Sequence, residues 1–360
     1  MGEEVYRRLA ERLDATPNGF PATESGVELR LLAKIFAPEE AALAAELRLR
    51  YEPADAVAAR AGVAPQEAYR MLKGMARKGL VRVRRGEGGL VFALLPFVVG
   101  FYEEQLPRMD QELAALADQY FRETAGRTIL DASPPIHRVV PVGEAVPFDL
   151  EVFPHEHAVS IIESARSWGV RDCICRVQKQ LVGEGCDYPV EACLVMAPVE
   201  GVFEGDGITR SISKEEALEI LRMTEEVGLV HTTGNYRDQN FYICNCCPCC
   251  CAVLRGLTEF DVPSAVARSG FRSVVEAEAC VGCGACVERC RFGALSLPED
   301  VAVVDPGRCL GCGVCVPACP EEAIRLERRP AEEVPPTPST IREWGLHRAQ
   351  ARGISLEEIV

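Results

Sequence analysis

Apolar residues recur at helical spacing along much of the first third of the chain. Between residues 65 and 78, an apolar face predicts a helix, and its members are Ala68, Met71, Leu72 and Met75. A shorter helix is expected just before it, at residues 54–61, with Gly62 making the turn between the two. The following stretch, LVRVRRGEGGLVFAL, has strand-forming residues on both sides of a glycine-rich turn and predicts a β-hairpin.

Further along, the pattern predicts three more helices and one linker. Residues 101–124 are amphipathic, and we expect one long helix there. A second helix is expected at 156–168, and a third begins at Ser213, which can form a capping box with Glu216. The proline- and valine-rich residues 134–147 are expected to be an extended linker.

Length and charge narrow the class of protein. The chain has 360 residues and a net charge of −15, and this length suits two or three domains. Residues 1–130 hold 18 basic and 19 acidic groups, whereas residues 131–260 hold 10 and 20. The acidic field of the second region disfavours nucleic-acid binding there. The longest apolar run, residues 90–102, is too short to span a membrane, and we expect a cytoplasmic protein with no membrane partner.

The chain has 18 cysteines, none before Cys173 and none after Cys319. Disulfides are unstable in the reducing cytoplasm, so metal binding is the favoured explanation. The clearest signal is the spacing C-x2-C-x2-C-x3-C, which occurs twice, offset by 29 residues. In this arrangement the fourth ligand of each [4Fe–4S] cluster comes from the other repeat. The expected ligands of the first cluster are Cys280, Cys283, Cys286 and Cys319, and those of the second are Cys309, Cys312, Cys315 and Cys290.

At these residues the chain resembles the bacterial-type ferredoxin domain with two [4Fe–4S] clusters, over about residues 272–328. The resemblance implies a ferredoxin-like fold and electron transfer. One position departs from the pattern: Pro320 follows Cys319 as expected, but Arg291 follows Cys290. A positive charge there is expected either to raise the potential of one cluster or to mark a docking face.

The order helix, turn, helix, hairpin in residues 54–94 resembles the winged helix-turn-helix domain. The second helix and the hairpin are basic, as DNA phosphates require; the basic residues are Arg70, Lys73, Arg77, Lys78, Arg82, Arg84 and Arg85. A neutral domain on an acidic protein weakens the case for DNA. The alternative is a docking or dimerisation module, and a homodimer through this domain is one of our predictions.

The middle of the chain contains ten more cysteines in two groups. Four thiolates suffice for one [4Fe–4S] cluster or one tetrahedral zinc ion, so ten allow one or two sites. We expect a further iron–sulfur cluster shared between the groups, with zinc as the main alternative and reactive thiols as the third. The candidate ligands are Cys173, Cys175, Cys186, Cys193, Cys244, Cys246, Cys247, Cys249, Cys250 and Cys251.

Four other residues near these cysteines are candidates for chemistry. Arg176, next to the first cysteine pair, is a candidate for balancing cluster charge. His231 is a candidate ligand or proton donor. His155 and His157 would point to one side on a strand, but they diverge at a helix start, where we place them, so surface positions are expected.

The whole chain resembles an uncharacterised family of iron–sulfur proteins from anaerobes, in which the motifs CICR, GCDYPVEACL and ICNCCPCCC occur in this order. We expect an α+β multidomain protein: a winged-helix-like domain at 1–130, an α/β cysteine-rich domain at 131–265, a ferredoxin domain at 266–330 and an arm at 331–360.

The predicted function is electron transfer from a redox partner protein, through the ferredoxin clusters, to the middle centre. A reductase reaction at that centre would make the protein an oxidoreductase. The alternatives are a redox-sensing winged-helix regulator and an assembly component with structural metals. No catalytic residue is predicted.

Overall fold

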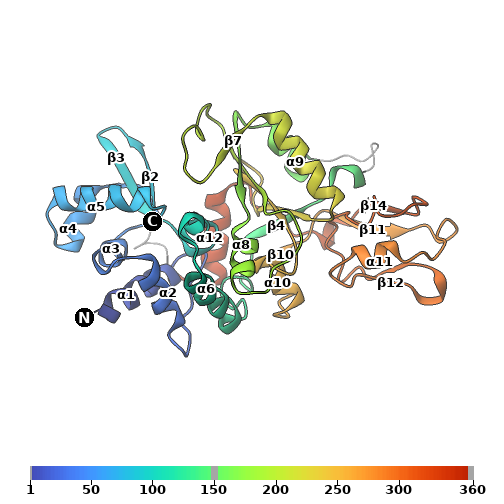
Figure 1. Cartoon of the computed structure of the whole chain (residues 1–360), viewed down its shortest axis with the longest axis horizontal. Coiled ribbons are helices and arrows are strands. Elements are labelled where there is room, and N and C mark those ends of the chain that lie inside the picture. The colour runs from blue at the N-terminus through green and yellow to red at the C-terminus, as the bar shows by residue number, and fades with distance from the viewer. Residues whose placement is uncertain (1, 147–152, 356–360) are drawn as a thin grey trace. The chain divides into compact units, whose positions relative to one another are not determined.

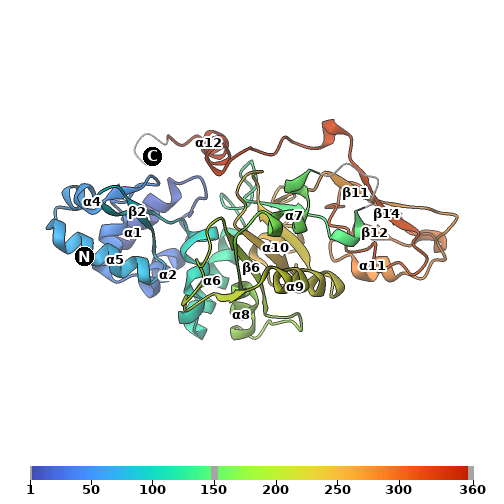
Figure 2. The same ribbon diagram turned by 90° about the horizontal axis from the view of Figure 1, so that it is seen from above.

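A computed structural model describes residues 2–146 and 153–355 of the chain (Figures 1 and 2). It divides into two compact units. The first comprises Met1–Ser133, Val177–Gly185 and Gly345–Val360, and the second comprises Pro134–Arg176 and Cys186–Trp344. The cysteines all belong to the second unit.

The first unit is mainly helical, with a small three-stranded sheet in the order β1-β3-β2. The two helices predicted at 54–61 and 65–78 and the hairpin after them are confirmed, and Gly62 adopts a left-handed φ of 67° between the helices. The elements are α1 (Gly2–Asp14), α2 (Val27–Ile35), α3 (Pro38–Ala44), β1 (Glu52–Pro53), α4 (Ala54–Ala61), α5 (Pro65–Arg77), β2 (Val81–Gly86), β3 (Gly89–Leu94), a π turn (Phe97–Phe101), a 3-10 helix (Glu103–Arg108) and α6 (Gln111–Thr124).

The prediction of one long helix at 101–124 is wrong. Only its second half, α6, is α-helical. Pro107 lies in the preceding 3-10 helix, and Asp110 caps α6 by accepting a hydrogen bond from the Leu113 N–H at 2.8 Å. The expected helix is therefore interrupted near a proline, which disfavours a continuous α-helix, and α6 begins after an N-cap residue.

The second unit is built on a seven-stranded sheet in the order β10-β4-β8-β9-β6-β5-β7. All of its pairings are antiparallel except that of β10 with β4, so this region is α+β rather than the expected α/β. Its strands are β4 (His137–Val140), β5 (Ser167–Asp172), β6 (Glu191–Ala197), β7 (Arg210–Ile212), β8 (Val230–Gly234), β9 (Tyr242–Cys246) and β10 (Val266–Ala267).

One face of the sheet is covered by α7 (Ala158–Glu163) and α9 (Lys214–Glu226), which lie beside β6 in Figure 2. Ile162 and Leu221 of these helices pack with Leu194 and Ile243 of the strands in one apolar core. The remaining short elements before residue 270 are 3-10 helices at Gly143–Ala145 and Pro154–Glu156, α8 (Ile174–Leu181) and α10 (Ala252–Thr258). This core contains no cysteine.

Two sequence predictions for this unit are wrong. The expected linker at 134–147 contains β4, which is buried between β10 and β8, and only position 147 lies outside the described residues. The helix expected at 156–168 ends at Glu163, because Trp168 belongs to β5. In both cases pairing within the sheet decides the local structure, which propensity alone does not reveal.

The cap predicted at Ser213 is confirmed in part. The Ser213 hydroxyl accepts a hydrogen bond from the Glu216 N–H at 3.1 Å at the start of α9. The Glu216 carboxylate, however, pairs with Arg210 at 2.6 Å instead of completing the capping box. The helix stops before Gly228, which has a φ of +85°.

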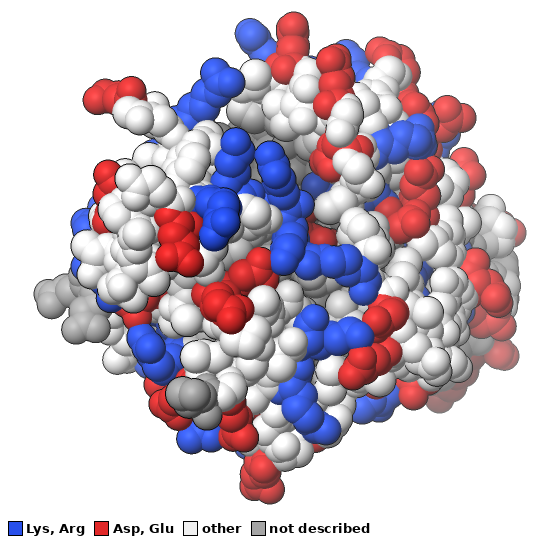
Figure 3. All heavy atoms as spheres, turned by 60° about the vertical axis from the view of Figure 1, so that its left-hand side comes forward, with Lys and Arg blue, Asp and Glu red and all other residues white. Residues whose placement is uncertain are grey.

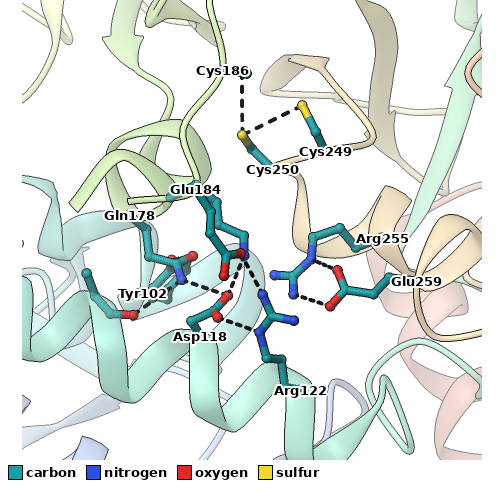
Figure 4. A network of polar contacts seen from close by, with 12 residues as sticks. Tyr102, Asp118, Arg122, Gln178, Glu184, Cys186, Cys249, Cys250, Arg255 and Glu259 are labelled. Atoms are coloured by element: carbon teal, nitrogen blue, oxygen red, sulfur yellow. Dashed lines mark hydrogen bonds and ion pairs between the residues drawn. The ribbon is translucent and has the colours of Figure 1, made fainter. Parts of the chain in front are cut away.

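In the first unit, a buried lysine fixes the segment 177–185. Lys179 is almost fully buried, and its ammonium lies 2.9 Å from the Asp118 carboxylate and 2.6 Å from that of Glu184. Arg122 joins both carboxylates, and Gln178 bonds to Tyr102 (Figure 4). This polar network holds the end of α8 and the turn that follows it, immediately before Cys186.

The C-terminal part of the second unit holds two short hairpin-like sheets, which Figure 1 shows grouped together. The elements are β11 (Phe271–Val275), α11 (Ala285–Arg289), β12 (Leu295–Ser296), a 3-10 helix (Pro298–Asp300), β13 (Val303–Val304), β14 (Ile324–Arg328) and a 3-10 helix (Ala331–Glu333). Strands β11 and β14 pair antiparallel, so residues 271–275 lie beside residues 324–328.

The chain then runs to α12 (Ile341–Ala351), which lies within the predicted arm. Arg348 of α12 is fully buried in the first unit, where it donates to the carbonyl oxygens of Pro17, Thr128, Ile129 and Ala132. None of the helices in the described ranges combines the length and apolar character needed to cross a bilayer.

Candidate metal centres

The C-terminal cysteine repeat forms two loops of similar backbone shape. Gly282 and Gly284 in the first loop and Gly311 and Gly313 in the second all have left-handed φ angles between 69° and 78°. At Gly311 a Cβ atom would lie 2.0 Å from the Phe271 carbonyl oxygen, so only glycine fits. The glycines therefore let each loop curl closely around its cysteines.

Each loop contributes three cysteines to one cavity and one cysteine to the other cavity. The first cavity is lined by Cys280, Cys283, Cys286 and Cys319. The second is lined by Cys290, Cys309, Cys312 and Cys315. Apolar side chains complete both walls, including those of Leu297 and Ile324 in the first and Phe292 and Leu295 in the second.

Backbone and hydroxyl donors already point at several of these sulfurs. The N–H groups of Ala302 and Ala323 lie 3.4 and 3.3 Å from the sulfurs of Cys280 and Cys319, and the Ser273 hydroxyl lies 3.2 Å from that of Cys315. Such hydrogen bonds stabilise negative charge on sulfur and tune the potential of a bound cluster. Burial raises the pKa of Cys315 to about 12, so metal coordination is what would hold this thiol deprotonated.

A known protein family matches this repeat. Residues 279–323 match the family model of the 4Fe-4S dicluster domain. Residues 279–323 form a 4Fe-4S dicluster domain. The domain implies two [4Fe–4S] clusters and indicates electron transfer.

No curated protein and no solved structure matches the chain. The matched family covers a small part of the 360 residues. The winged-helix resemblance of the first unit and the resemblance of the whole chain to an anaerobe family therefore stay predictions.

A second set of cysteines lies beside the seven-stranded sheet of the second unit. Cys186, Cys247, Cys249 and Cys250 bring their sulfurs within 4.8 Å of one another, and we call them the four-cysteine group. The Cys186 sulfur lies 3.9 Å from that of Cys247. The Cys250 sulfur lies 3.5 Å from that of Cys186 and 3.8 Å from that of Cys249 (Figure 4). Cys186 comes from the loop before β6, and the other three come from the loop between β9 and α10.

These distances suit one metal ion. Metal–sulfur bonds of about 2.3 Å in a tetrahedron place the four sulfurs about 3.8 Å apart. A cube binds each thiolate on a different iron and therefore holds its ligands further apart. The four-cysteine group can thus hold a single zinc or iron ion, whereas we expected cluster ligands.

The electrostatics of the group also favour metal binding. Contacts from the Cys249 and Cys250 thiols, together with the charge of Arg176, lower the pKa of Cys247. Cys247 and Cys250 are buried against Leu229, while Cys249 is exposed. A thiolate is the form that binds metal, so a lowered pKa favours coordination by Cys247.

The remaining six middle cysteines lie outside this group. They are Cys173, Cys175, Cys193, Cys244, Cys246 and Cys251, and none of them forms a disulfide in the part of the chain that the structure describes. Cys193 of β6 faces Cys244 of β9 across the sheet. The ten candidates are therefore divided by the structure into a group of four and a set of six.

Arg176 lies beside both sets of cysteines, as a residue that balances their charge should. Its side chain is fully buried, and it donates to the carbonyl oxygens of Pro189 at 2.8 Å and Asn245 at 2.6 Å. Burial opposes its charge, but the sulfurs of Cys173, Cys247 and Cys246 raise its pKa overall. A role in charge balance stays a prediction that this position supports.

The predicted histidines do not join the four-cysteine group. His231 is fully buried, with Nδ1 2.6 Å from Asn245 Oδ1 and Nε2 3.1 Å from Glu225 Oε1. Both of its nitrogens are thus engaged. His155 stacks on Phe153, and His157 precedes α7, where its Nδ1 lies 3.2 Å from the Ser160 hydroxyl.

Sequence reasoning missed Asn245, which fixes the cysteine run within the sheet, and Arg289, which joins the dicluster domain to the sheet. Asn245, between two cysteines, bonds to His231 and donates to the Ala192 carbonyl at 2.7 Å. Arg289, in the dicluster domain, donates to the Glu225 carbonyl at 3.0 Å. The available signal was Asn245 itself, the one polar residue inside the run of cysteines.

Proposed function

We propose that this chain is an iron–sulfur electron-transfer protein that takes electrons from a redox partner protein and passes them to metal bound by the middle cysteines. The observation that carries the proposal is the presence of a 4Fe-4S dicluster domain in the same compact unit as the four-cysteine group. Iron–sulfur clusters supply one-electron chemistry, and a dicluster domain arranges two of them in series.

In this proposal each cube is bound by the four cysteines that line one cavity. Cys280, Cys283, Cys286 and Cys319 hold the first cube, and Cys309, Cys312, Cys315 and Cys290 hold the second. The crossed fourth ligands then tie the two loops together. The nearby N–H and hydroxyl donors offset the negative charge that the cysteine sulfurs carry.

Direct contacts between the second cavity and the sheet support electron transfer between the dicluster domain and the cysteine run. The Val142 N–H donates to the Cys312 carbonyl at 2.9 Å. Arg289, which precedes Cys290, donates to the backbone of Glu225, whose carboxylate contacts His231. His231 contacts Asn245, which lies between Cys244 and Cys246. A short path of packed groups therefore joins the second cavity to the cysteine run.

An equilibrium reductive titration of anaerobically purified chain tests the proposal. About eight irons and eight sulfides should be bound by the dicluster domain. EPR and Mössbauer spectra should show reversible reduction of these clusters and of a further centre. A chain whose middle metal never changes oxidation state, although the dicluster is reduced, would contradict electron transfer to that metal and leave it structural.

One observation supports the regulator alternative. Arg70, Lys73 and Arg77 of α5 and Arg84 and Arg85 of β2 are all exposed. Figure 3 looks onto the side that carries α4, α5 and the hairpin, and Lys and Arg side chains run in a band across it among acidic ones. DNA affinity that changes when the clusters are reduced would favour regulation. The absence of such a change would leave this face to protein docking.

A further inference from the structure

The six cysteines outside the four-cysteine group form a continuous row. Cys193 contacts Cys244, which contacts Cys246 two residues later on β9. Residues two apart on a strand share one face of the sheet, so these thiols project together. Cys246 contacts Cys251 at the start of α10.

The row continues through the first turn of α8. Cys251 contacts Cys175, which contacts Cys173. Cys246 and Cys251 are buried, and the other four are half-buried. We call Cys193, Cys244, Cys246, Cys251, Cys175 and Cys173 the six-cysteine row. Its members come from three separate stretches of sequence, and the fold brings them together.

The row is more extended than the four-cysteine group. Among the described residues, the four-cysteine group is the set in which at least three potential metal-ligand atoms all lie within 4.8 Å of one another. No three sulfurs of the six-cysteine row, all of them described, lie that close together. The row is therefore wider than the ligand shell of one tetrahedral ion. A larger, sulfide-bridged centre with several irons suits this spread.

A buried charge gives a second, independent reason. Arg176 is fully buried, and its Nε has no hydrogen-bond partner in the described part of the structure. It lies next to Cys173 and Cys246 of the row and to Cys247 of the four-cysteine group. A buried guanidinium is costly unless negative charge lies beside it, and thiolates bound to a metal centre supply such charge.

We propose that the six-cysteine row supplies the ligands of an iron–sulfur cluster, separate from the single-ion site of the four-cysteine group. This inference rests on the proposed function and identifies the middle centre that accepts electrons. The chain would then hold two cubes in the dicluster domain, one cluster in the row and one ion in the four-cysteine group. Arg176 lies between the last two centres and balances their charge.

The test uses the full chain purified without oxygen, with iron, acid-labile sulfide and zinc counted per chain. The double variant Cys246→Ser, Cys251→Ser should lose about four irons and four sulfides, the content of one cube, and keep the single ion. The matched variant Cys249→Ser should lose one metal ion and no sulfide. Sulfide unchanged in the double variant overturns the inference, and so does the loss of one zinc ion in its place.

Two single variants test the same inference if the double variant does not fold. Cys173→Ser, at the half-buried end of the row, should alter the EPR signal of the middle cluster while the dicluster signals persist. Arg176→Met should leave iron and sulfide counts unchanged and lower the midpoint potential of that cluster, because a neighbouring positive charge is removed. Unchanged EPR and potential in both variants would contradict the assignment.

The counting experiment separates this inference from the proposed function. Electron transfer could fail while the row still binds a cluster. In that case the double variant contains less sulfide than the unmodified chain, but the middle cluster of the unmodified chain stays oxidised during the reductive titration. The row could equally be empty while the dicluster passes electrons to an iron ion in the four-cysteine group, since zinc cannot accept them. Each result contradicts one claim and leaves the other standing.

Discussion

The dicluster domain and the seven-stranded sheet both gather cysteines, but they do so in opposite ways. In the dicluster domain the apolar core itself includes Cys286 and Cys315, together with Leu295, Ala302 and Ile324. In the sheet the core has twelve buried residues and no cysteine, and the thiols lie outside this core, on strands β6 and β9, in α8 and in the segments next to α8 and α10. The first fold therefore depends on its metal, whereas the second offers metal sites on a frame that its apolar core supports.

Metal removal should produce the largest difference in stability between the dicluster domain and the sheet. When the chain is stripped of metal by chelation under reducing conditions, β11, β14 and α11 should lose protection against hydrogen exchange, because the clusters connect loops that have little other core. Strands β6, β8 and β9 should keep theirs. Hydrogen exchange followed by mass spectrometry measures both regions in one sample. Loss of protection in both regions together would refute the claim that the sheet stands alone.

A cavity in the sheet's core should have the next largest effect. Leu194→Ala should lower the free energy of unfolding of the metal-free chain by about 2–5 kcal/mol, because Leu194 is almost fully buried in the core. Urea unfolding measures the change. Val199→Ala, at a side chain 61% exposed, is the control and should change it by less than about 0.5 kcal/mol. Equal effects of the two substitutions would count against this core.

Acid should destabilise the sheet through His137 of β4. Burial lowers the pKa of His137 from its usual 6.5 to about 4, so the unfolded chain binds this proton more tightly than the folded one. Stability is therefore full above pH 6.5 and falls as the pH drops towards 4, by about 3 kcal/mol. Unfolding of the metal-free chain across this range measures the loss.

The matched variant His137→Gln should flatten that part of the pH profile. The dicluster domain, residues 279–323, contains no histidine, so it adds no histidine titration to this slope. A profile unchanged by the substitution would assign the acid sensitivity to other groups.

The smallest predicted effect concerns the arginine that follows Cys290. Arg291 is exposed and lines an open cleft together with Arg268 and Arg308, beside the second cavity. Arg291→Gln should lower the midpoint potential of one dicluster centre by the equivalent of less than about 1 kcal/mol, since water and salt screen an exposed charge. Potentiometric EPR titration measures the shift, with Arg342→Gln on α12 as the control. A larger shift in the control would rule out a local effect.

The dicluster domain could be predicted from the sequence because its information is local. Three ligands of each cube lie within seven residues, and glycines at matching places permit the tight loops. Helices α4 and α5 were predictable for a similar reason, since Gly62 and Pro65 mark their ends. The break at Pro107 and Asp110 carried the same kind of signal, and the amphipathic pattern around it concealed the break.

The middle centres could not be predicted in this way. Cys186 and Cys247 are 61 positions apart, and only the sheet brings their sulfurs to 3.9 Å. Strand β4 was hidden because it is four residues long and bounded by prolines. The sequence therefore names all ten thiols, but their division into a group of four and a row of six depends on strand pairing over long range.

Rapid mixing with a one-electron reductant, followed by freeze-quench EPR and Mössbauer spectroscopy, tests the central claim most directly. We expect the dicluster centres to be reduced first and the middle centre to follow. In the Cys312→Ser variant, which lacks a ligand of the second cavity, this later step should be at least about tenfold slower. Reduction of the middle centre at the same rate with and without an intact dicluster would show that the dicluster does not supply its electrons.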